Sequence, residues 1–412
     1  MSSTKSFEIS KHSVMEAYKH VKANRGAAGV DDETIEAFES DLKNNLYKIW
    51  NRMSSGTYFP PAVKQVAIPK ASGGERKLGI PTVGDRVAQM VVKMHFEPMV
   101  EPIFHKNSFG YRPGRSPLHA VGQARQQCFT YPWVMEFDIK GLFDNIDHDL
   151  LMKAVHKHTE EKWVILYIER WLKAPFQTKE GEIISREKGT PQGGVISPLL
   201  ANLFLHYAFD QWMDREYPHL PFERFADDGI VHCRSEGEAK HVMASLARRL
   251  SDCKLEIHPV KSRIVYCKDD KRKREYANTK FVFLGYEFRA RLCKAGSGNI
   301  FAGFAPAVSP ASRKKLMDTV RKLRVPLRPG SSLGDLQTWI NPIMRGWINY
   351  FGVYFRSALR VTARLVNRVI VNWAKRKFKR FRRRRGPAMA WLRQIFMKNP
   401  KLFAHWSLGF SV

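Results

Sequence analysis

An acidic pair lies between two short apolar runs in residues 222–231, which read Phe-Glu-Arg-Phe-Ala-Asp-Asp-Gly-Ile-Val. This pattern predicts a β-hairpin that carries Asp227 and Asp228 at its tip. Two carboxylates at one turn repel each other, and a divalent cation between them removes that repulsion. Because Asp-Asp-Gly is also an ordinary turn sequence, the pair alone leaves both interpretations open.

A third carboxylate precedes the hairpin in the sequence. Residues 133–137 predict a strand that ends at Asp138, and Asp147 has the position of an N-cap for a helix that begins near Leu150. If this strand neighbours the hairpin in one sheet, the three carboxylates would hold two Mg²⁺ ions about 3.5–4 Å apart, as in nucleotidyl transfer. Mg²⁺ keeps several waters and shares substrate phosphates, so two or three carboxylates suffice.

The order of the motifs along the chain resembles that of the reverse transcriptases encoded by bacterial group II introns, which are also called maturases. The resemblance covers about residues 20–410, and the landmarks that carry it are 24–31 (NRGAAGVD), 68–70 (IPK), 76–81 (RKLGIP), 109–113 (FGYRP), 137–140 (FDIK), 189–194 (GTPQGG), 227–228 (DD), 261–262 (KS) and 283–286 (FLGY). It implies an α+β fold: a right-hand polymerase with fingers and an antiparallel palm sheet, followed by a helical thumb and maturase domain.

The resemblance also implies the roles of individual residues. The catalytic carboxylates would be Asp138, Asp227 and Asp228, and the two Mg²⁺ ions would be bound by Asp138, Asp227 and the backbone carbonyl of Ile139. The remaining nucleotide-binding residues would be Lys70 and Arg76 on the triphosphate, Gln192 against the nucleotide, Phe143 at the sugar and Lys261 on the cationic side of the pocket. Fixed cations suit the charge that develops on a transferring phosphate.

Two aromatic positions need separate comment. Phe143 has the position of a sugar gate, since its ring would fill the space that a ribose 2′-hydroxyl needs. Without the resemblance, ordinary core packing explains Phe143 equally well.

Phe225 departs from the family pattern, because related enzymes usually carry Tyr there. The substitution removes a hydroxyl close to the primer end but keeps the ring, so we expect activity to persist with altered primer handling.

The composition indicates a folded and strongly basic protein. The chain has 412 residues, 44% of them hydrophobic, and its 69 Lys and Arg against 39 Asp and Glu give a net charge of +30. Such an excess favours nucleic acid as the partner, with an anionic membrane surface as the competing explanation. No apolar run approaches the roughly 18–20 residues of a spanning helix, and the polar start has no signal-peptide core. The five cysteines are scattered, which argues against a zinc site or a disulfide framework.

The predicted organisation has four parts: an N-terminal extension at 1–58, fingers and palm at 59–295 with the palm mainly at 131–158 and 221–295, a thumb and maturase domain at 306–385, and a short C-terminal DNA-binding segment at 386–412. Hydrophobic periodicity predicts the elements within them. The helices are expected at 32–53, 85–97, 160–173, 197–215 and 236–250 and again from Ser309 onward, and the strands at 63–68, 263–267 and 281–289.

Residues 375–385 hold nine positive charges in eleven positions, KRKFKRFRRRR. A solvated helix face is the ordinary explanation, but this density, interleaved with Phe378 and Phe381, favours contact with phosphates. The predicted nucleic-acid-binding residues are Arg112, Lys375, Arg376, Lys377, Lys379, Arg380, Arg382 and Arg383. Trp339 and Trp347 are eight residues apart and share one helix face, which favours a core position over base stacking.

These features predict an Mg²⁺-dependent, RNA-directed DNA polymerase of a group II intron, which assists splicing and supports mobility by target-primed reverse transcription. Its partners would be the intron RNA, an RNA template with a DNA primer, target DNA and deoxynucleoside triphosphates, while the oligomeric state is left open. The C-terminus has no His/Asn/Cys array, so we expect the endonuclease-lacking type, which needs a primer from elsewhere. We expect a bacterial cytoplasmic, nucleoid-associated protein without membrane contact.

Two alternatives of other kinds stay open at this point. One is a splicing cofactor that binds RNA but has lost polymerase activity. The other is a domesticated host reverse transcriptase that serves defence or repair. An RNA-dependent RNA polymerase is disfavoured, because Phe143 as a sugar gate would exclude ribonucleotides.

Overall fold

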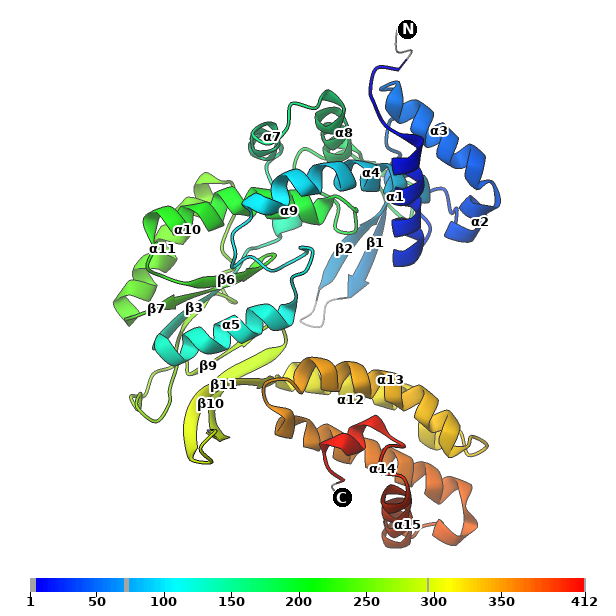
Figure 1. The fold of residues 1–412 in the computed structure, drawn as a ribbon, viewed down its shortest axis with the longest axis vertical. Helices are drawn as coiled ribbons and strands as arrows, with labels where there is room; N and C mark the ends of the chain where they lie inside the picture. Colours follow the sequence, from blue (N-terminus) through cyan, green and yellow to red (C-terminus); the bar gives the residue numbers. More distant parts are fainter. Residues whose placement is uncertain (1–4, 70–73, 295, 411–412) are drawn as a thin grey trace. The chain divides into compact units, whose positions relative to one another are not determined.

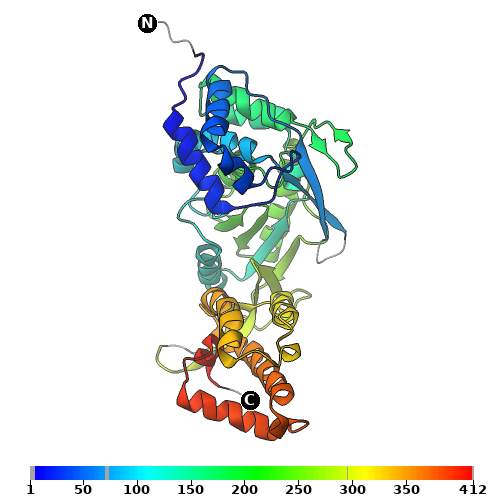
Figure 2. The ribbon, with the colours of Figure 1, turned by 90° about the vertical axis from the view of Figure 1, so that its right-hand side faces the viewer.

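The computed structural model describes residues 5–69, 74–294 and 296–410. The chain forms two compact units, which are described separately (Figure 1, Figure 2). The first unit contains the residues up to 116, 136–231 and 240–263, and the second contains 117–135, 232–239 and the residues from 264 onward. In the part of the chain that is described, no helix is long and apolar enough to cross a membrane.

The first unit combines helices with two sheets. Its helices are α1 (Lys11–Asn24), α2 (Ile35–Ser40), α3 (Leu42–Ser54), α4 (Val83–Val100), α6 (Leu142–Asn145), α7 (His148–His156), α8 (Lys162–Lys173), α9 (Ser197–Leu205), α10 (Gln211–Glu216) and α11 (Glu236–Asp252). Its strands are β1 (Val63–Pro69), β2 (Glu75–Ile80), β3 (Trp133–Asp138), β4 (Phe176–Gln177), β5 (Ile183–Ile184), β6 (Phe222–Phe225), β7 (Asp228–Cys233) and β8 (Arg263–Tyr266). Some residues of β3, β7, β8 and α11 are assigned to the second unit.

The helix predictions for this unit missed one break and one insertion. The single helix expected over 32–53 is wrong, because Asp41, at φ −124° and ψ 42°, separates α2 from α3. The helix expected over 197–215 is interrupted by a π-helical segment, His206–Asp210, between α9 and α10. The predicted N-cap of α7 is confirmed, since Oδ1 of Asp147 accepts the backbone N–H of Leu150 at 2.9 Å.

The sheet that carries the acidic residues has the strand order β6-β7-β3-β8. Strands β6 and β7 form the predicted hairpin, in an antiparallel register that runs from Phe222↔Val231 to Phe225↔Asp228. Strand β3 lies beside β7, so the strand that ends at Asp138 neighbours the hairpin. The second sheet, β2-β1-β4-β5, contains a β1–β2 hairpin that pairs Ile68 with Arg76.

The second unit is built from a three-stranded sheet and helices. Its elements are α5 (Pro117–Thr130), β9 (Lys280–Phe283), β10 (Tyr286–Lys294), β11 (Ile300–Val308), α12 (Pro310–Lys322), α13 (Leu333–Phe351), α14 (Arg360–Lys377) and α15 (Arg385–Lys398). The sheet has the antiparallel order β11-β10-β9. The single strand expected over 281–289 is wrong, because Leu284 and Gly285 both have positive φ and turn the chain between β9 and β10.

Strand β11 was not predicted. Its sequence, IFAGFAPAV, is rich in Ala, Gly and Pro and has few of the β-branched residues that favour strands. Pairing with β10 over nine residues, from Tyr286↔Val308 to Lys294↔Ile300, overrides that weak local preference.

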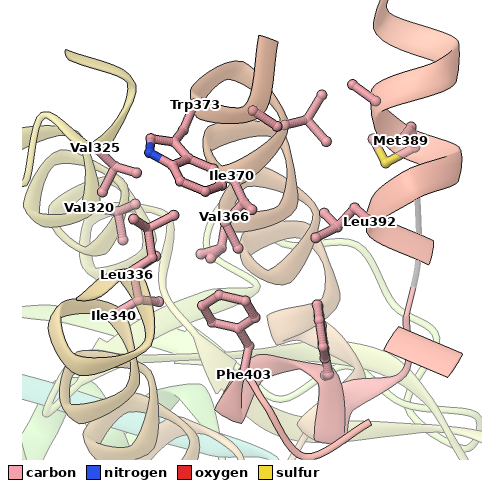
Figure 3. Close-up of a cluster of buried hydrophobic side chains, with 14 of the residues drawn as sticks. Val320, Val325, Leu336, Ile340, Val366, Ile370, Trp373, Met389, Leu392 and Phe403 are labelled. Atoms are coloured by element: carbon pink, nitrogen blue, oxygen red, sulfur yellow. The ribbon is translucent and has the colours of Figure 1, made fainter. Parts of the chain in front are cut away.

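One hydrophobic core joins the helices of the second unit (Figure 3). Its buried side chains include Leu336 of α13, Trp373 of α14 and Leu392 of α15, together with Phe403 beyond the last helix. Residues after 386 therefore contribute to the same core as the predicted thumb. Helix α12 begins as the Ser309-Pro310 pair predicts, with Oγ of Ser309 accepting the N–H of Ser312.

A buried histidine makes this core sensitive to acid. His405 is fully buried, and its Nε2 lies 2.7 Å from Oδ1 of Asn367. Because that oxygen only accepts, Nε2 donates and the other ring nitrogen, Nδ1, is unprotonated. Burial lowers the pKa of His405 to about 3 from an ordinary value of 6.5.

We expect the C-terminal unit to lose stability as the pH falls from 7 to 5. The unfolded chain protonates His405 near pH 6.5 whereas the folded chain does not, so the loss reaches about 2 kcal/mol at pH 5. Urea unfolding followed by tryptophan fluorescence at the two pH values measures it. In His405→Gln, which can still donate to Asn367 but cannot titrate, the loss should be smaller by about that amount. An unchanged pH dependence in this variant would contradict the assignment.

Candidate active site

The acidic residues lie at the turn between β6 and β7. Ala226 has a φ of +56°, a left-handed backbone conformation that residues other than glycine rarely adopt. The chain turns sharply at this residue, and Asp227 follows it directly before β7. The backbone N–H of Ile139, just after β3, donates to the carbonyl of Asp227 at 3.3 Å. The ends of β3 and of the hairpin are thus joined, and they bring together the carboxylates that lie far apart in the sequence.

The three carboxylates influence one another. Burial raises the pKa of Asp227, and the charge of Asp138 raises it further, against the opposing charges of Arg76 and Lys261. Burial, followed by repulsion from Asp227 and Asp138, raises the pKa of Asp228 to about 7. Asp228 is partly exposed to solvent, which weakens this repulsion without removing it. A hydrogen bond with Asp138 raises the pKa of Asp228 further.

Strand β3 is fixed around Asp138 by the segment before β8. The carbonyl of Asp138 accepts the N–H of His258 at 2.7 Å, and its own N–H donates to Oγ of Ser262 at 3.2 Å. Nζ of Lys261 donates to Oδ2 of Asp138 at 2.7 Å. Lys261 was predicted to lie on the cationic side of the nucleotide pocket, and in this structure its ammonium group contacts the carboxylate of Asp138.

The donor set fits the divalent cation that the family resemblance implies. No group of three or more His, Cys, Asp or Glu side chains in the described ranges is arranged as a complete metal site. However, Asp138, Asp227 and Asp228 supply only hard oxygen ligands. The raised pKa values of Asp227 and Asp228 indicate a local excess of negative charge. Here the ammonium group of Lys261 supplies part of the positive charge that a bound cation would otherwise bring.

Two glycines permit the close approaches that form the site. A methyl group on Gly229 would lie 2.1 Å from the ring of Phe137, so β7 can lie this close to β3 only without a side chain at 229. A methyl group on Gly110 would lie 2.5 Å from the backbone nitrogen of Ala226, so the loop after α4 packs directly on the turn that carries Asp227. Glycine at both positions is a requirement of packing.

Tyr111 is a site residue that the sequence interpretation missed. Its ring lies 6.4 Å from that of Phe143, edge to face, and 6.3 Å from that of Phe225. Burial and then the charge of Asp227 raise its pKa, while Arg76 opposes the change, so its hydroxyl lies within electrostatic reach of both. Its φ is +56°, and its position in the FGYRP landmark was the available sequence signal.

The predicted nucleotide pocket is partly assembled. Phe143 in α6 is buried, and its carbonyl accepts the N–H of Thr190 at 2.7 Å. The carbonyl of Gln192 accepts the N–H of Gly79 in β2 at 2.8 Å, so the GTPQGG loop contacts both α6 and β2. Arg76 lies on the exposed part of β2. Lys70 lies outside the described residues, and the predicted role of the Ile139 carbonyl stays a prediction.

The structure places Arg112 differently from the prediction. Its guanidinium is buried and donates to Glu101 at 2.9 Å and to the carbonyls of His105 and Ser108, each at 2.7 Å. Because its hydrogen-bond donors already have partners within the protein, the guanidinium is not available to bind a phosphate. Arg112 therefore supports the loop that carries Tyr111 and does not form part of a nucleic-acid surface.

The basic segment 375–385 is not one continuous helix. Helix α14 ends at Lys377, whose Nζ donates to the carbonyls of Pro329 and Ser331. Phe378 and Phe381 pack against Trp391 of the core and do not face solvent as a base-stacking surface. The most exposed cations of the segment are Arg376, Lys379, Arg380 and Arg382 to Arg385.

Comparison with known proteins agrees with this geometry. Residues 68–288 match the family described as reverse transcriptase (RNA-dependent DNA polymerase), and residues 313–391 match the group II intron, maturase-specific domain. The chain belongs to the group II intron reverse transcriptases. Its α+β architecture, with a palm-type sheet and a helical C-terminal region, confirms the predicted fold class.

Curated relatives cover this reverse transcriptase to different extents. The group II intron-encoded protein LtrA of Lactococcus lactis is 36% identical over 193 residues, which are 46% of this chain and 32% of LtrA. Protein YkfC of Escherichia coli is 28% identical over 319 residues, or 68% of this chain and 81% of YkfC. Residues of this chain thus match about a third of the length of LtrA.

Solved structures with some likeness include two telomerases. That of Candida tropicalis, truncated from the C-terminal domain, has a TM-score of 0.43 at 14% identity, covering 55% of this chain and 53% of that one. That of Candida albicans, in complex with a telomeric RNA fragment, has a TM-score of 0.47 at 11% identity, covering 92% and 68%.

Proposed function

We propose that this protein is an RNA-directed DNA polymerase encoded by a group II intron, and that it also binds the intron RNA to assist splicing and mobility. The observation that carries the proposal is the convergence of Asp138, Asp227 and Asp228 beside Lys261 and Arg76. The presence of both the reverse transcriptase and the maturase-specific sequences in one chain supports the second role.

The chain's own residues would divide the work of nucleotidyl transfer. Lys70, together with Arg76 of strand β2, would bind the triphosphate of the incoming nucleotide. Asp228 would lie beside the primer terminus, and Lys261 would release Asp138 and turn to the substrate phosphates. Two Mg²⁺ ions held by Asp138, Asp227 and the Ile139 carbonyl would supply Lewis-acid stabilisation of the attacking and leaving oxygens.

The second unit would provide the RNA-binding surface. Exposed cations follow one another from Arg376 to Arg385, and such clusters bind phosphates without reading the sequence. Intron RNA, an RNA template with its DNA primer, and target DNA are the proposed partners, with deoxynucleoside triphosphates as substrates.

A primer-extension assay separates this function from its main alternative. The purified protein, given Mg²⁺, an RNA template and a DNA primer, should incorporate deoxynucleotides. A splicing cofactor without polymerase activity would bind RNA and incorporate nothing. The domesticated host enzyme would pass this assay, and it is distinguished by the gene's context, because an intron-encoded protein is read from within a folded ribozyme.

Phe143→Ala is expected to raise the use of ribonucleotides relative to deoxynucleotides about 10-fold or more. The Phe143 ring would otherwise exclude the 2′-hydroxyl, and loss of such a steric contact is worth roughly 1–3 kcal/mol of discrimination. Competing incorporation of the two nucleotide types by the wild type and the variant measures it. Phe225→Ala, which removes the second ring near Tyr111, is the control. Unchanged selectivity in Phe143→Ala would mean that another residue excludes the hydroxyl.

A further inference from the structure

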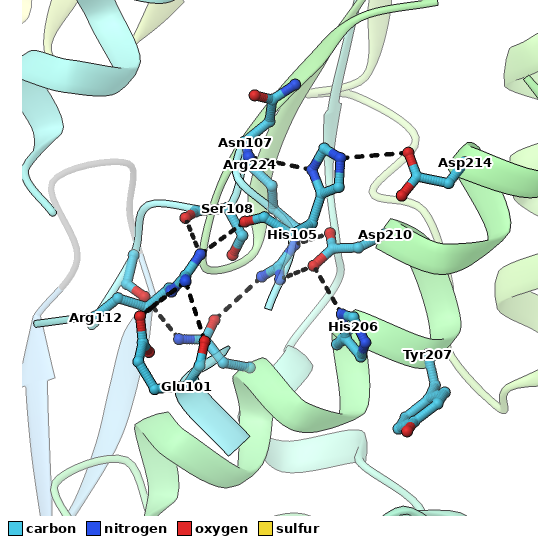
Figure 4. Close-up of polar contacts among 12 residues, drawn as sticks. Glu101, His105, Asn107, Ser108, Arg112, His206, Tyr207, Asp210, Asp214 and Arg224 are labelled. Carbon is cyan, nitrogen blue, oxygen red and sulfur yellow. Dashed lines mark hydrogen bonds and ion pairs between the residues drawn. The ribbon is translucent and has the colours of Figure 1, made fainter. Parts of the chain in front are cut away.

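Directly before the catalytic turn lies a fully buried ion pair. The side chains of Arg224 and Asp210 are both 0% exposed. Nε of Arg224 donates to Oδ1 of Asp210 at 2.7 Å and Nη2 donates to Oδ2 at 2.6 Å, as Figure 4 shows. An ion pair buried so completely is often no more stabilising than an apolar pair of equal volume. Stability alone therefore gives no reason for its presence.

The third guanidinium nitrogen reaches the catalytic turn itself. Nη1 of Arg224 donates to the carbonyl of Ala226 at 3.3 Å and to Oδ1 of Asn202 at 3.2 Å. Nδ2 of Asn202 in turn donates to the carbonyl of Gly110 at 2.6 Å, and Gly110 is the residue that packs on the backbone of Ala226. Ala226 thus accepts a hydrogen bond from Arg224 and packs against Gly110, and Asn202 links these two residues by hydrogen bonds.

The backbone around Arg224 is also fixed. Its N–H donates to the carbonyl of Asn107 at 2.9 Å, and its carbonyl accepts the N–H of Phe109 at 2.8 Å. Asp210 is the last residue of the π-helical segment between α9 and α10. Single π-helical turns of this kind recur at functional sites, where the extra residue redirects a side chain. Here that side chain is the carboxylate that orients Arg224.

We propose that Arg224 and Asp210 are positioning residues for catalysis: the pair anchors the Ala226 carbonyl to the π-helical segment and so fixes the direction in which Asp227 presents its carboxylate. The proposal rests on the proposed polymerase function. Ala226 has a left-handed backbone that a free turn would leave, so the bond from Nη1 holds the turn in the conformation that the site needs.

The decisive variant replaces both charges by apolar groups, Arg224→Met with Asp210→Leu. Because neither charge is left without its partner, the fold should be retained, with a melting temperature close to that of the wild type. The turn, however, loses its anchor. We expect kcat in RNA-templated extension to fall about 100-fold, as a misplacement of about 1 Å would cause. The KM for deoxynucleotides should change little, because the pair touches none of the predicted triphosphate-binding residues.

A matched control comes from a second arginine that contacts the π-helical segment. Arg249 donates to the carbonyls of Tyr207 and Ala208 at 3.0 and 3.2 Å and makes no bond to the turn. Arg249→Met should lower the melting temperature and leave kcat near the wild-type value. If Arg249→Met and the double variant lower kcat equally, the pair only supports the segment and the proposal is overturned.

A second readout does not depend on polymerase activity. Binding of Mn²⁺ to the full chain without nucleotide, measured by electron paramagnetic resonance, should weaken at least about 5-fold in the double variant and stay unchanged in Arg249→Met. Absence of extension by the wild type would contradict the proposed polymerase function, whereas equal Mn²⁺ affinity of the wild type and the folded double variant would contradict the positioning role.

Discussion

Asp227→Asn is expected to lower the rate of deoxynucleotide incorporation at least about 1,000-fold, equivalent to about 4 kcal/mol of transition-state stabilisation. The carboxylate lies at the turn where β3 and the β6–β7 hairpin meet, and the amide that replaces it cannot supply the negative charge that a divalent cation requires. Single-turnover primer extension on an RNA template, at saturating Mg²⁺ and nucleotide, is the measurement.

The same substitution should leave the fold intact or stabilise it. Burial and the charge of Asp138 raise the pKa of Asp227, so ionising this group costs folding free energy at neutral pH. Asparagine removes that cost. Loss of activity together with an unchanged or higher melting temperature therefore separates a catalytic role from a structural one. Glu216→Gln, which alters an exposed carboxylate paired with Arg215, is the control and should change neither quantity. Extension by Asp227→Asn at more than a tenth of the wild-type rate would refute the catalytic assignment.

Gly229→Ala is expected to lower the free energy of unfolding by about 3 kcal/mol and to abolish activity, since overpacking a tight core costs typically 1–3 kcal/mol and the contact here is severe. The added methyl would overlap the ring of Phe137. That ring cannot easily move away, because its centroid lies 4.9 Å from the centroid of the Phe209 ring. Strands β7 and β3 would separate, and with them Asp228 and Asp138. Urea unfolding and primer extension measure the two effects.

A compensating change tests the cause. Phe137→Leu removes part of the ring that the methyl would strike, so the double variant Gly229→Ala with Phe137→Leu should be more stable than Gly229→Ala alone. Gly237→Ala is the matched control, because a methyl there meets only Oγ of Ser235, at 3.9 Å, in the first turn of α11. Stability lost equally in the single and the double variant would show that the clash with Phe137 is not responsible.

The sequence sufficed where a local pattern has one structural solution. Apolar runs around Asp227 and Asp228 allow little except a hairpin, and the cap at Asp147 and the Ser309-Pro310 start were visible for the same reason. The strand order of the sheet could not be predicted from local patterns. Strand β3 lies beside β7 because distant segments of the chain pair, and only the family resemblance suggested this pairing. Tyr111 and Arg112 show the limit most clearly, because adjacent residues of one motif have opposite environments, and no local pattern separates them.

The misses have physical causes too. Helix α2 ends because the backbone of Asp41 is not helical, and the spacing of hydrophobic residues does not predict the backbone conformation of a single residue. Leu284 adopts positive φ although it is not a glycine, so the turn before β10 had no compositional mark beyond Gly285. Strand β11 is poor in strand-forming residues and exists because β10 pairs along its whole length.

The hydrogen bond from Asp138 to Ser262 joins residues 124 positions apart. Contacts of such long range form late, since the chain between them must be closed first. During translation, the turn that carries Asp227 and Asp228 is synthesised before Ser262, the residue that contacts β3. The nascent chain therefore cannot form this contact before Ser262 has been released, which is after more than half of the 412 residues have been made.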